Sequence, residues 1–230
     1  MAVDEALLES AAASGRCSLR FYQWRQPTLS LGYFQSHAVR ASHHASRACP
    51  LVRRQTGGGA ILHDRELTYS LFIPQSHPLA VDSTRLYVVV HEAIQAVLQA
   101  HRVSATICAN PHKVAKGEEP FLCFQRRAIG DMLSGTAKIC GSAQRRRHGA
   151  VLQHGSLLFA QSGCAPELPG ILELCGQPLT PAAVITAVAH ELAGRLGFDF
   201  QPGELETDEF EAATGLLSRK YANPTWTERR

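Results

Sequence analysis

A run of three glycines, Gly57-Gly58-Gly59, stands between two expected strands, where the backbone can come close to a ligand. Its spacing fits neither a dinucleotide-binding fingerprint nor a phosphate-binding P-loop, and a glycine-rich hairpin explains the composition equally well. Arg53 and Arg54 precede the run on an expected strand. Since side chains alternate across a strand, we expect only one of the two to face a site. His63 and Asp64 follow the run and either position reacting groups or anchor the turn.

Lys138 lies among small and apolar residues. A partly desolvated lysine suits the binding of a carbonyl oxygen or a negative charge, although an exposed strand lysine is the commoner case. The seven cysteines include no Cys-x-x-Cys pair, so we interpret them as free thiols, any of which can be a nucleophile. Cys123 stands between aromatic residues and, by residue type alone, is as consistent with a small buried hydrophobe. Neither the cysteines nor the histidines have zinc-ligand spacing, so we expect no metal.

The 230 residues, with a net charge of +3, fit one domain over residues 1–230. We find no dense basic stripe with interleaved aromatic residues, which argues against nucleic acid as a partner. We also find no apolar run of the ~20 residues that cross a bilayer, which argues against a membrane protein. The acidic start lacks the layout of a signal peptide, so we expect a cytoplasmic protein. The mild positive charge would suit docking to an acidic protein surface.

Apolar spacings of three and four residues predict an amphipathic helix from Thr84 to about His101. Strands are expected before and after it, and helices fill the last third, a pattern that favours an α+β fold with a mixed, mostly antiparallel sheet. Other expectations are strands over Val103–Ala109, Phe121–Phe124, Ala150–Gln153 and Ser156–Phe159, a polar loop over 110–120, and helices over Pro166–Leu174 and from Glu204 to about Tyr221.

Taken in order, these segments resemble the lipoate–protein ligase and octanoyl transferase family, which is related to biotin ligases. The resemblance covers nearly the whole chain, and its glycine and lysine segments together are specific. It is carried by the stretches MAVDEALL, RFYQWRQPTLSLGYFQ, RRQTGGGAILHD, LTYSLFIP, AKICGSAQRRRHGAVLQHGSLLF and KYANPTWTERR. Within the family, Cys123-Phe124 ahead of the lysine segment is most similar to the octanoyl transferases that load the glycine-cleavage H protein.

The resemblance implies a catalytic domain of the biotin/lipoate ligase type, with a central sheet that cradles the acyl chain. It implies that Cys123 carries the acyl group as a thioester and that Lys138 lies beside it. Octanoyl-acyl carrier protein would be the donor, and a lipoyl domain or the H protein the acceptor, with no cofactor. Another branch of the family places its nucleophile near Cys175, which is therefore an alternative. The implied substrate-binding residues are Arg53, Gly57, Gly58, Gly59, His63, Asp64, Gly141 and Ser142.

Two other functions remain open on the sequence. An ATP-dependent lipoate ligase would hold an acyl-adenylate, with ATP and Mg²⁺ as cofactors, and would not need Cys123. Many such ligases carry a further C-terminal domain, for which this sequence has no room. A non-catalytic carrier-binding protein would retain the fold without forming an acyl-enzyme. The family usually has another strand ahead of the MAVDEALL helix, so the resemblance leaves open whether a strand is missing from the start.

Overall fold

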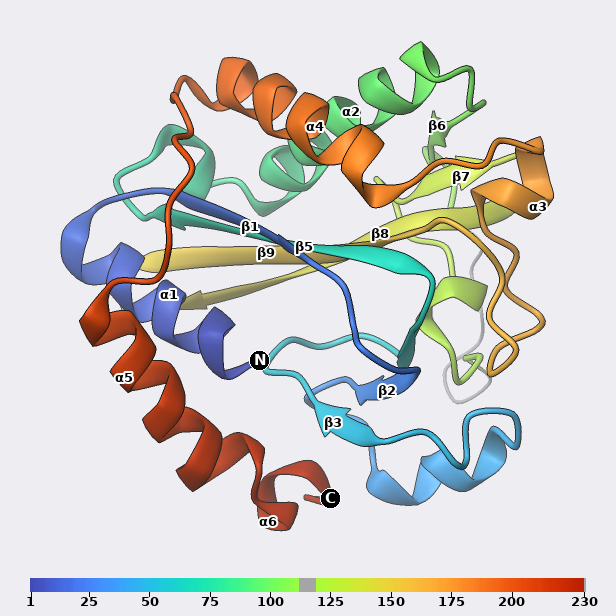
Figure 1. Ribbon diagram of the computed structural model, residues 1–230, viewed down its shortest axis with the longest axis horizontal. Coiled ribbons are helices and arrows are strands. Elements are labelled where there is room, and N and C mark those ends of the chain that lie inside the picture. Colours follow the sequence, from blue (N-terminus) through green and yellow to red (C-terminus); the bar gives the residue numbers. More distant parts are fainter. Residues whose placement is uncertain (112–118, 230) are drawn as a thin grey trace.

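The computed structural model describes residues 1–111 and 119–229. Its main sheet has six strands in the order β1-β5-β9-β8-β7-β6, and every neighbouring pair is antiparallel (Figure 1). A smaller sheet has the order β3-β2-β4, in which β2 is parallel to β3 and antiparallel to β4. The expected α+β fold with a mostly antiparallel sheet is confirmed. The strands are β1 (Ser18–Tyr22), β2 (Thr28–Leu31), β3 (Leu51–Arg53), β4 (Ile61–His63), β5 (Glu66–Pro74), β6 (Thr106–Ile107), β7 (Met132–Ser134), β8 (Ala137–Arg147) and β9 (Ala150–Leu158).

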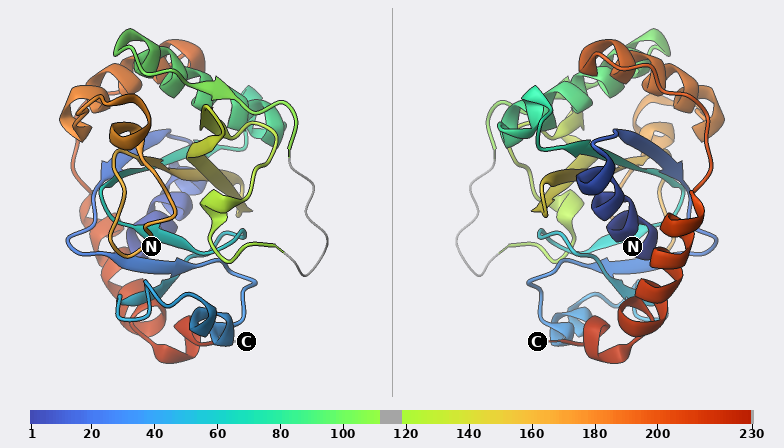
Figure 2. Two further views of the ribbon diagram at one scale, coloured as in Figure 1. Left: turned by 90° about the vertical axis from the view of Figure 1, so that its right-hand side faces the viewer. Right: turned by 90° about the vertical axis from the view of Figure 1, so that its left-hand side faces the viewer.

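Helices cover both faces of the main sheet (Figures 1 and 2). One face carries α2 and α4; the other carries α1, and α5 lies alongside α1. The α-helices are α1 (Ala2–Ser14), α2 (Ser83–Ala100), α3 (Ile171–Cys175), α4 (Pro181–Leu196), α5 (Thr207–Leu216) and α6 (Pro224–Thr227). Short 3₁₀ helices are η1 (His37–Ser42), η2 (Pro78–Ala80) and η3 (Cys123–Gln125), and η4 (Leu217–Tyr221) is a π-helical turn.

Strand β5 shows how the layers form, because its side chains alternate between the two faces of the sheet. Leu71 and Ile73 belong to the core beneath α2 and α4, whereas Phe72 packs against Leu8 of α1. Every residue of β5 is buried, as expected for a strand covered on both faces. The sheet is therefore a rigid support for residues on β8 and β9, which lie next to it.

Helix α2 confirms the helix expected from Thr84 to about His101. Its apolar residues recur on one face and enter the main core, and the Asp82 side chain caps its first turn by accepting from the Arg85 N–H. The periodicity located this helix within one residue at each end.

The strand expected over Phe121–Phe124 is wrong. Only Leu122 forms a bridge, parallel to Ala60, and the chain then turns into the 3₁₀ helix η3. The Cys123 N–H bonds the Ala60 carbonyl, while the Arg126 N–H bonds back to the Cys123 carbonyl and closes the turn. A short apolar run is compatible with a buried strand and with a buried turn, so its composition did not decide between them.

Other element boundaries also differ. The two strands expected around His154-Gly155 form one strand, β9. Position 155 requires glycine because of the neighbouring strand, since a Cβ there would lie 2.6 Å from the Gly141 carbonyl oxygen. The strand over Val103–Ala109 shortens to β6, and the helix over Pro166–Leu174 shortens to α3. The last expected helix begins at Thr207, later than Glu204. Most of the polar loop over 110–120 lies outside the described residues.

Among the residues that the structure describes, no helix is long and apolar enough to cross a membrane. The small sheet packs below the main sheet through its own cluster, which includes Leu29, Leu31 and Leu62 together with Leu122 and Leu158. The loop between β3 and β4 contains the three glycines, so this packing brings them towards β8 and β9.

Glu5 on α1 joins three parts of the fold. Its buried carboxylate accepts hydrogen bonds from Lys220 at 2.5 Å, Tyr221 at 2.6 Å and Arg147 at 2.8 Å. Burial acts to raise the pKa of Glu5, but the hydrogen bonds from Lys220 and Tyr221 and the nearby cations outweigh it and hold this pKa below its usual value. The ionised carboxylate therefore stabilises the contact of α1 with the C-terminal segment and with the end of β8.

We expect Glu5→Gln to lower the free energy of unfolding at neutral pH by about 3 kcal/mol, because it removes the buried carboxylate and leaves Lys220 and Arg147 without their counter-charge. A carboxylate with a lowered pKa stabilises the fold above its unfolded pKa and stops doing so as pH falls through the folded one. The difference between the two proteins should thus close below about pH 4. Urea unfolding at several pH values measures it, with Glu9→Gln on the same helix as the control; a difference independent of pH would contradict the assignment.

Candidate active site

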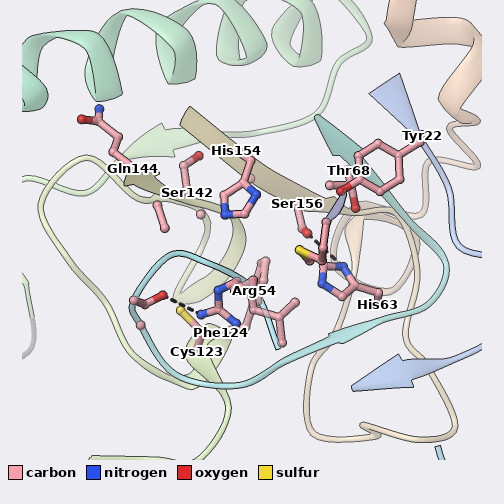
Figure 3. Close-up of a pocket in the computed structure, with 17 residues that line it drawn as sticks. Tyr22, Arg54, His63, Thr68, Cys123, Phe124, Ser142, Gln144, His154 and Ser156 are labelled. Carbon is pink, nitrogen blue, oxygen red and sulfur yellow. Dashed lines mark hydrogen bonds between the residues drawn. The ribbon is translucent and has the colours of Figure 1, made fainter. Parts of the chain in front are cut away.

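A cavity of about 320 Å³ lies between the two sheets (Figure 3). Its volume falls near the lower end of the ~300–1,000 Å³ typical of ligand pockets. Strands β8 and β9 form one wall and the glycine loop with β4 another. Seven residues named from the sequence as site candidates line it: Arg54, Gly57, Gly58, His63, Cys123, Gly141 and Ser142.

The glycine loop lies directly against the segment that carries Cys123. A Cβ at Gly59 would lie 3.1 Å from the Cys123 nitrogen and 3.1 Å from the Phe121 oxygen, so a larger residue would push the two segments apart. Gly58 has a φ of 92°, in the left-handed region that glycine adopts without strain. The glycines therefore allow a close approach to the Cys123 segment of the protein, and the approach of a ligand to this loop stays a prediction.

Cys123 and Lys138 meet in the folded chain. The Lys138 Nζ atom lies 4.0 Å from the Cys123 Sγ atom, and the half-buried thiol faces the cavity. The alternative thiol, Cys175, is the last residue of α3 and lies 3.3 Å from the Ser134 hydroxyl. Among the described residues that line the cavity, the only cysteine is Cys123. The arrangement therefore favours Cys123 as the nucleophile.

Lys138 is held by a carboxylate for which the sequence predicted no role. The Asp131 Oδ2 atom lies 2.8 Å from Nζ, and both side chains are buried. Asp131 also accepts from the Tyr87 hydroxyl at 2.6 Å and from the Ala128 N–H at 2.7 Å. A Cβ at Gly141 would lie 2.6 Å from Nζ, so this glycine leaves room for the lysine. Since a buried ammonium requires a counter-charge, the low exposure expected for Lys138 was the available signal for such a partner.

Arg53 ends β3 and Arg54 directly follows it, and the two side chains point to opposite sides of the backbone, as alternation in extended chain required. Arg54 lines the cavity; Arg53, which the resemblance placed in the site, instead donates to the carbonyl oxygens of Thr227 at 3.0 Å and Arg229 at 2.9 Å. Arg54 donates to the carbonyls of Gly57 at 2.8 Å and Gly59 at 2.7 Å and so fixes the shape of the glycine loop. Burial lowers the pKa of Arg54 to about 10, a value at which it keeps its charge at neutral pH.

His63 and Asp64 have separate positions. His63 lines the cavity, stacks on Trp24 with ring centroids 4.3 Å apart, and has Nδ1 3.2 Å from the Glu66 carboxylate. Asp64 accepts from the Ser162 hydroxyl at 2.7 Å and is not among the described residues that line the cavity. The placement of Asp64 fits the turn-anchoring interpretation, whereas His63 is available to a ligand.

Buried histidines orient two further polar groups beside the cavity. His154 on β9 lies 2.7 Å from the Thr56 hydroxyl and 3.4 Å from Asp4, and burial lowers its pKa although Asp4 opposes the shift. Ser142 Oγ lies 2.6 Å from His91 Nε2, and burial lowers the pKa of His91 to about 4, so that this ring is neutral. No role was predicted for either histidine, because only the tertiary contacts distinguish them from the other histidines.

Within residues 1–111 and 119–229, no group of three or more His, Cys, Asp or Glu side chains is arranged to hold a metal ion. The described residues of the site bring together a thiol, Cys123, and two cations, Lys138 and Arg54. These are the components of nucleophilic acyl transfer, in which a thiolate attacks a carbonyl and cations or N–H groups stabilise the oxyanion.

Comparison with known proteins identifies the class to which this fold and site belong. The family model described as the lipoyl protein ligase A/B catalytic domain matches residues 1–167. The chain belongs to this family. The resemblance stated from the sequence is thus confirmed.

The chain is similar over its full length to two curated octanoyltransferases. It is 34% identical to octanoyltransferase LipM of Kyrpidia tusciae over 260 residues, covering 100% of this chain and 94% of the relative. It is 31% identical to octanoyltransferase LipM of Moorella thermoacetica over 255 residues, covering 100% and 93%. These relatives confirm the class of enzyme expected, an acyltransferase.

A solved structure with the same fold is a putative lipoate protein ligase of T. acidophilum with bound lipoic acid, at a TM-score of 0.79 and 24% identity, covering 99% of this chain and 92% of that one. Lipoate-protein ligase A bound with ATP superposes with a TM-score of 0.78 at 24% identity, with the same coverage of 99% and 92%. At this identity the likeness concerns the fold, and it confirms the expected biotin/lipoate ligase-like architecture.

We expect Asp131→Asn to lower the free energy of unfolding by about 3 kcal/mol, because it leaves the buried Lys138 ammonium without its counter-charge. The double variant Lys138→Met/Asp131→Asn removes both charges and should recover most of this loss. Urea unfolding followed by circular dichroism measures both. A loss below about 1 kcal/mol in Asp131→Asn, the size typical of an exposed pair, would contradict a buried ion pair.

Proposed function

We propose that this chain is an octanoyl (or lipoyl) transferase. It would take the acyl group from an acyl carrier protein, hold it on Cys123 as a thioester, and pass it to a lysine of a lipoyl-carrier protein such as the glycine-cleavage H protein. The observation that carries the proposal is the position of the Cys123 thiol, which faces the cavity 4.0 Å from the Lys138 ammonium. The full-length similarity to octanoyltransferases supports the acyl group named.

In the first step the Cys123 thiolate attacks the carbonyl carbon of the donor thioester. The new Sγ–C bond forms, and negative charge develops on the carbonyl oxygen. Lys138, which pairs with Asp131 and lies 4.0 Å from the Cys123 Sγ atom, would stabilise this oxyanion together with backbone N–H groups of the glycine loop. The bond to the carrier sulfur then breaks, and the released carrier thiolate takes up a proton from solvent.

In the second step a neutral lysine amine of the acceptor attacks the acyl-enzyme. The N–C bond forms, the Sγ–C bond breaks, the nitrogen loses a proton to solvent, and the Cys123 thiolate is regenerated. Exchange between thioesters is nearly balanced and amide formation is downhill, so the reaction needs no nucleotide. Ile61, Phe124 and Tyr22 supply apolar surface in the cavity for the acyl chain.

Intact-protein mass spectrometry after incubation with octanoyl-acyl carrier protein tests the proposal. We expect an octanoyl adduct that hydroxylamine removes, because hydroxylamine cleaves thioesters. The adduct should be present on the wild type and on Cys175→Ala and absent from Cys123→Ala. Cys175→Ala is the matched control, since it removes a half-buried thiol of the same chain outside the cavity.

Three results would contradict the proposal in different ways. Loss of the adduct only in Cys175→Ala would move the nucleophile to that residue. Full activity of Cys123→Ala with lipoate and ATP would instead make the protein an ATP-dependent ligase. A protein that binds the carrier but forms no adduct and transfers no acyl group would be a non-catalytic carrier-binding protein.

A further inference from the structure

The charge nearest to Cys123 by the printed distances is already balanced. Lys138 lies 4.0 Å from the thiol, but Asp131 is closer to the ammonium, at 2.8 Å. Because an opposite charge at that distance cancels most of the field of an ammonium, the pair offers the thiolate a dipole and not a net positive charge. A thiolate next to this pair alone would gain little from it.

Arg54 differs from Lys138 in the partners that surround its charge. In the part of the chain that the structure describes, its hydrogen-bond acceptors are the carbonyl oxygens of Ser30, Gly57 and Gly59, and it forms no ion pair with a carboxylate. Its Nε atom is buried without an acceptor. The side chain is 2% exposed, so water screens its charge weakly. Arg54 is therefore a buried cation for which the described residues, 1–111 and 119–229, supply no counter-charge.

This cation ends beside the thiol. A Cβ at Gly58 would lie 3.1 Å from Arg54 Nη2 and 3.9 Å from Cys123 Sγ, so the guanidinium and the sulfur both border the same small space beside Gly58. Figure 3 shows the guanidinium of Arg54 and the sulfur of Cys123 at the same end of the cavity. A thiolate and a guanidinium attract each other because their charges are opposite. The charge of Cys123 accordingly acts to raise the pKa of Arg54, although the larger effect of burial lowers it.

The other ionisable groups around the thiol do not replace Arg54. Arg126 directly follows η3 and is partly exposed, and its Nε donates to the Pro120 carbonyl at 2.7 Å. His154 lines the cavity, but burial lowers its pKa and so disfavours the charged form of its ring. His63 lines the cavity in contact with the Glu66 carboxylate.

We propose that Arg54, and not Lys138, is the counter-charge that stabilises the thiolate of Cys123. Deprotonation of the thiol breaks the S–H bond and releases the proton to solvent, and the sulfur anion pairs with the guanidinium across Gly58. Lys138 and Asp131 then remain an intact pair whose ammonium serves the acyl oxygen. This division of roles deepens the proposed function and rests on it only for the transfer step, because the thiolate forms in the free protein.

Alkylation by iodoacetamide tests the division without any acyl donor, since the thiolate is the reacting form. The rate at Cys123 is followed by peptide mass spectrometry between about pH 5 and 9, and the other cysteines serve as internal references. We expect Arg54→Gln to slow alkylation at neutral pH roughly tenfold, because an opposite charge within ~4–6 Å shifts an ionisation by one unit or more. The charge-retaining Arg54→Lys should stay within about threefold of wild type.

Two further variants make the test specific. In the double variant Lys138→Met/Asp131→Asn, the rate of alkylation at Cys123 should stay within about twofold of wild type, because the variant removes a pair with no net charge. The same variant should lose acyl transfer, because it lacks the Lys138 ammonium. Arg53→Gln is the matched control: it removes an equally buried guanidinium on the other side of the same extended backbone and should also stay within about twofold. Thermal unfolding of each variant reports whether it is folded.

If alkylation at Cys123 were slowed tenfold in the double variant and ran at the wild-type rate in Arg54→Gln, the proposal would be overturned. Lys138 would then be the counter-charge of the thiolate. Equal slowing in Arg53→Gln and Arg54→Gln would also overturn it, since the effect would then follow from damage to the strand. If Arg54→Gln does not fold, the other two variants still test the proposal. A rate of alkylation at Cys123 that is roughly tenfold below wild type, in Arg54→Lys or in the double variant, would then be enough to overturn it. Absence of octanoyl transfer by the wild type would count against the proposed function and leave the alkylation result intact.

Discussion

Two hydrogen bonds to the backbone of Ala60 determine where the Cys123 thiol lies. The Ala60 N–H donates to the Phe121 oxygen at 3.0 Å, and the Cys123 N–H donates to the Ala60 oxygen at 2.7 Å. They join segments far apart in the chain, and the absence of a side chain at Gly59 makes their approach possible. The same loop is held by Arg54 through two of its carbonyls. Thiol, loop and guanidinium therefore form one unit, in which displacement of any member moves the others.

Three buried cations in this region have different partners, and the partner determines what each can do. Arg53 donates to carbonyl oxygens of the C-terminal segment and so binds that segment to β3. Lys138 has a carboxylate and is thereby fixed as a directed hydrogen-bond donor. Arg54 has carbonyl dipoles on one side and the thiol on the other. Because burying a charge is costly, a buried cation without a counter-ion is expected where an anion forms during function.

The fold could be predicted from sequence wherever one periodicity extended over many residues. Helix α2 repeats its apolar positions over five turns, and its ends were located within a residue. The short apolar run that carries Cys123 was misassigned as a strand, because four residues cannot distinguish a strand from a buried turn. The interruption expected at His154-Gly155 was also wrong: glycine was required there by the neighbouring strand, and not by a turn. Local patterns omit such contacts, since they involve residues distant along the chain.

For the site, the sequence by itself determined the residue types and the family: a glycine loop, a lysine among small residues and a set of free thiols. It also determined that Arg53 and Arg54 face opposite ways, since alternation is a local property of a strand. Only the tertiary structure decided that Arg54 is the one in the cavity, that Cys123 meets Lys138, and that Asp131 holds this lysine. Each of these depends on which sheet lies opposite the side chain, and this is set by the packing of the small sheet beneath β8 and β9.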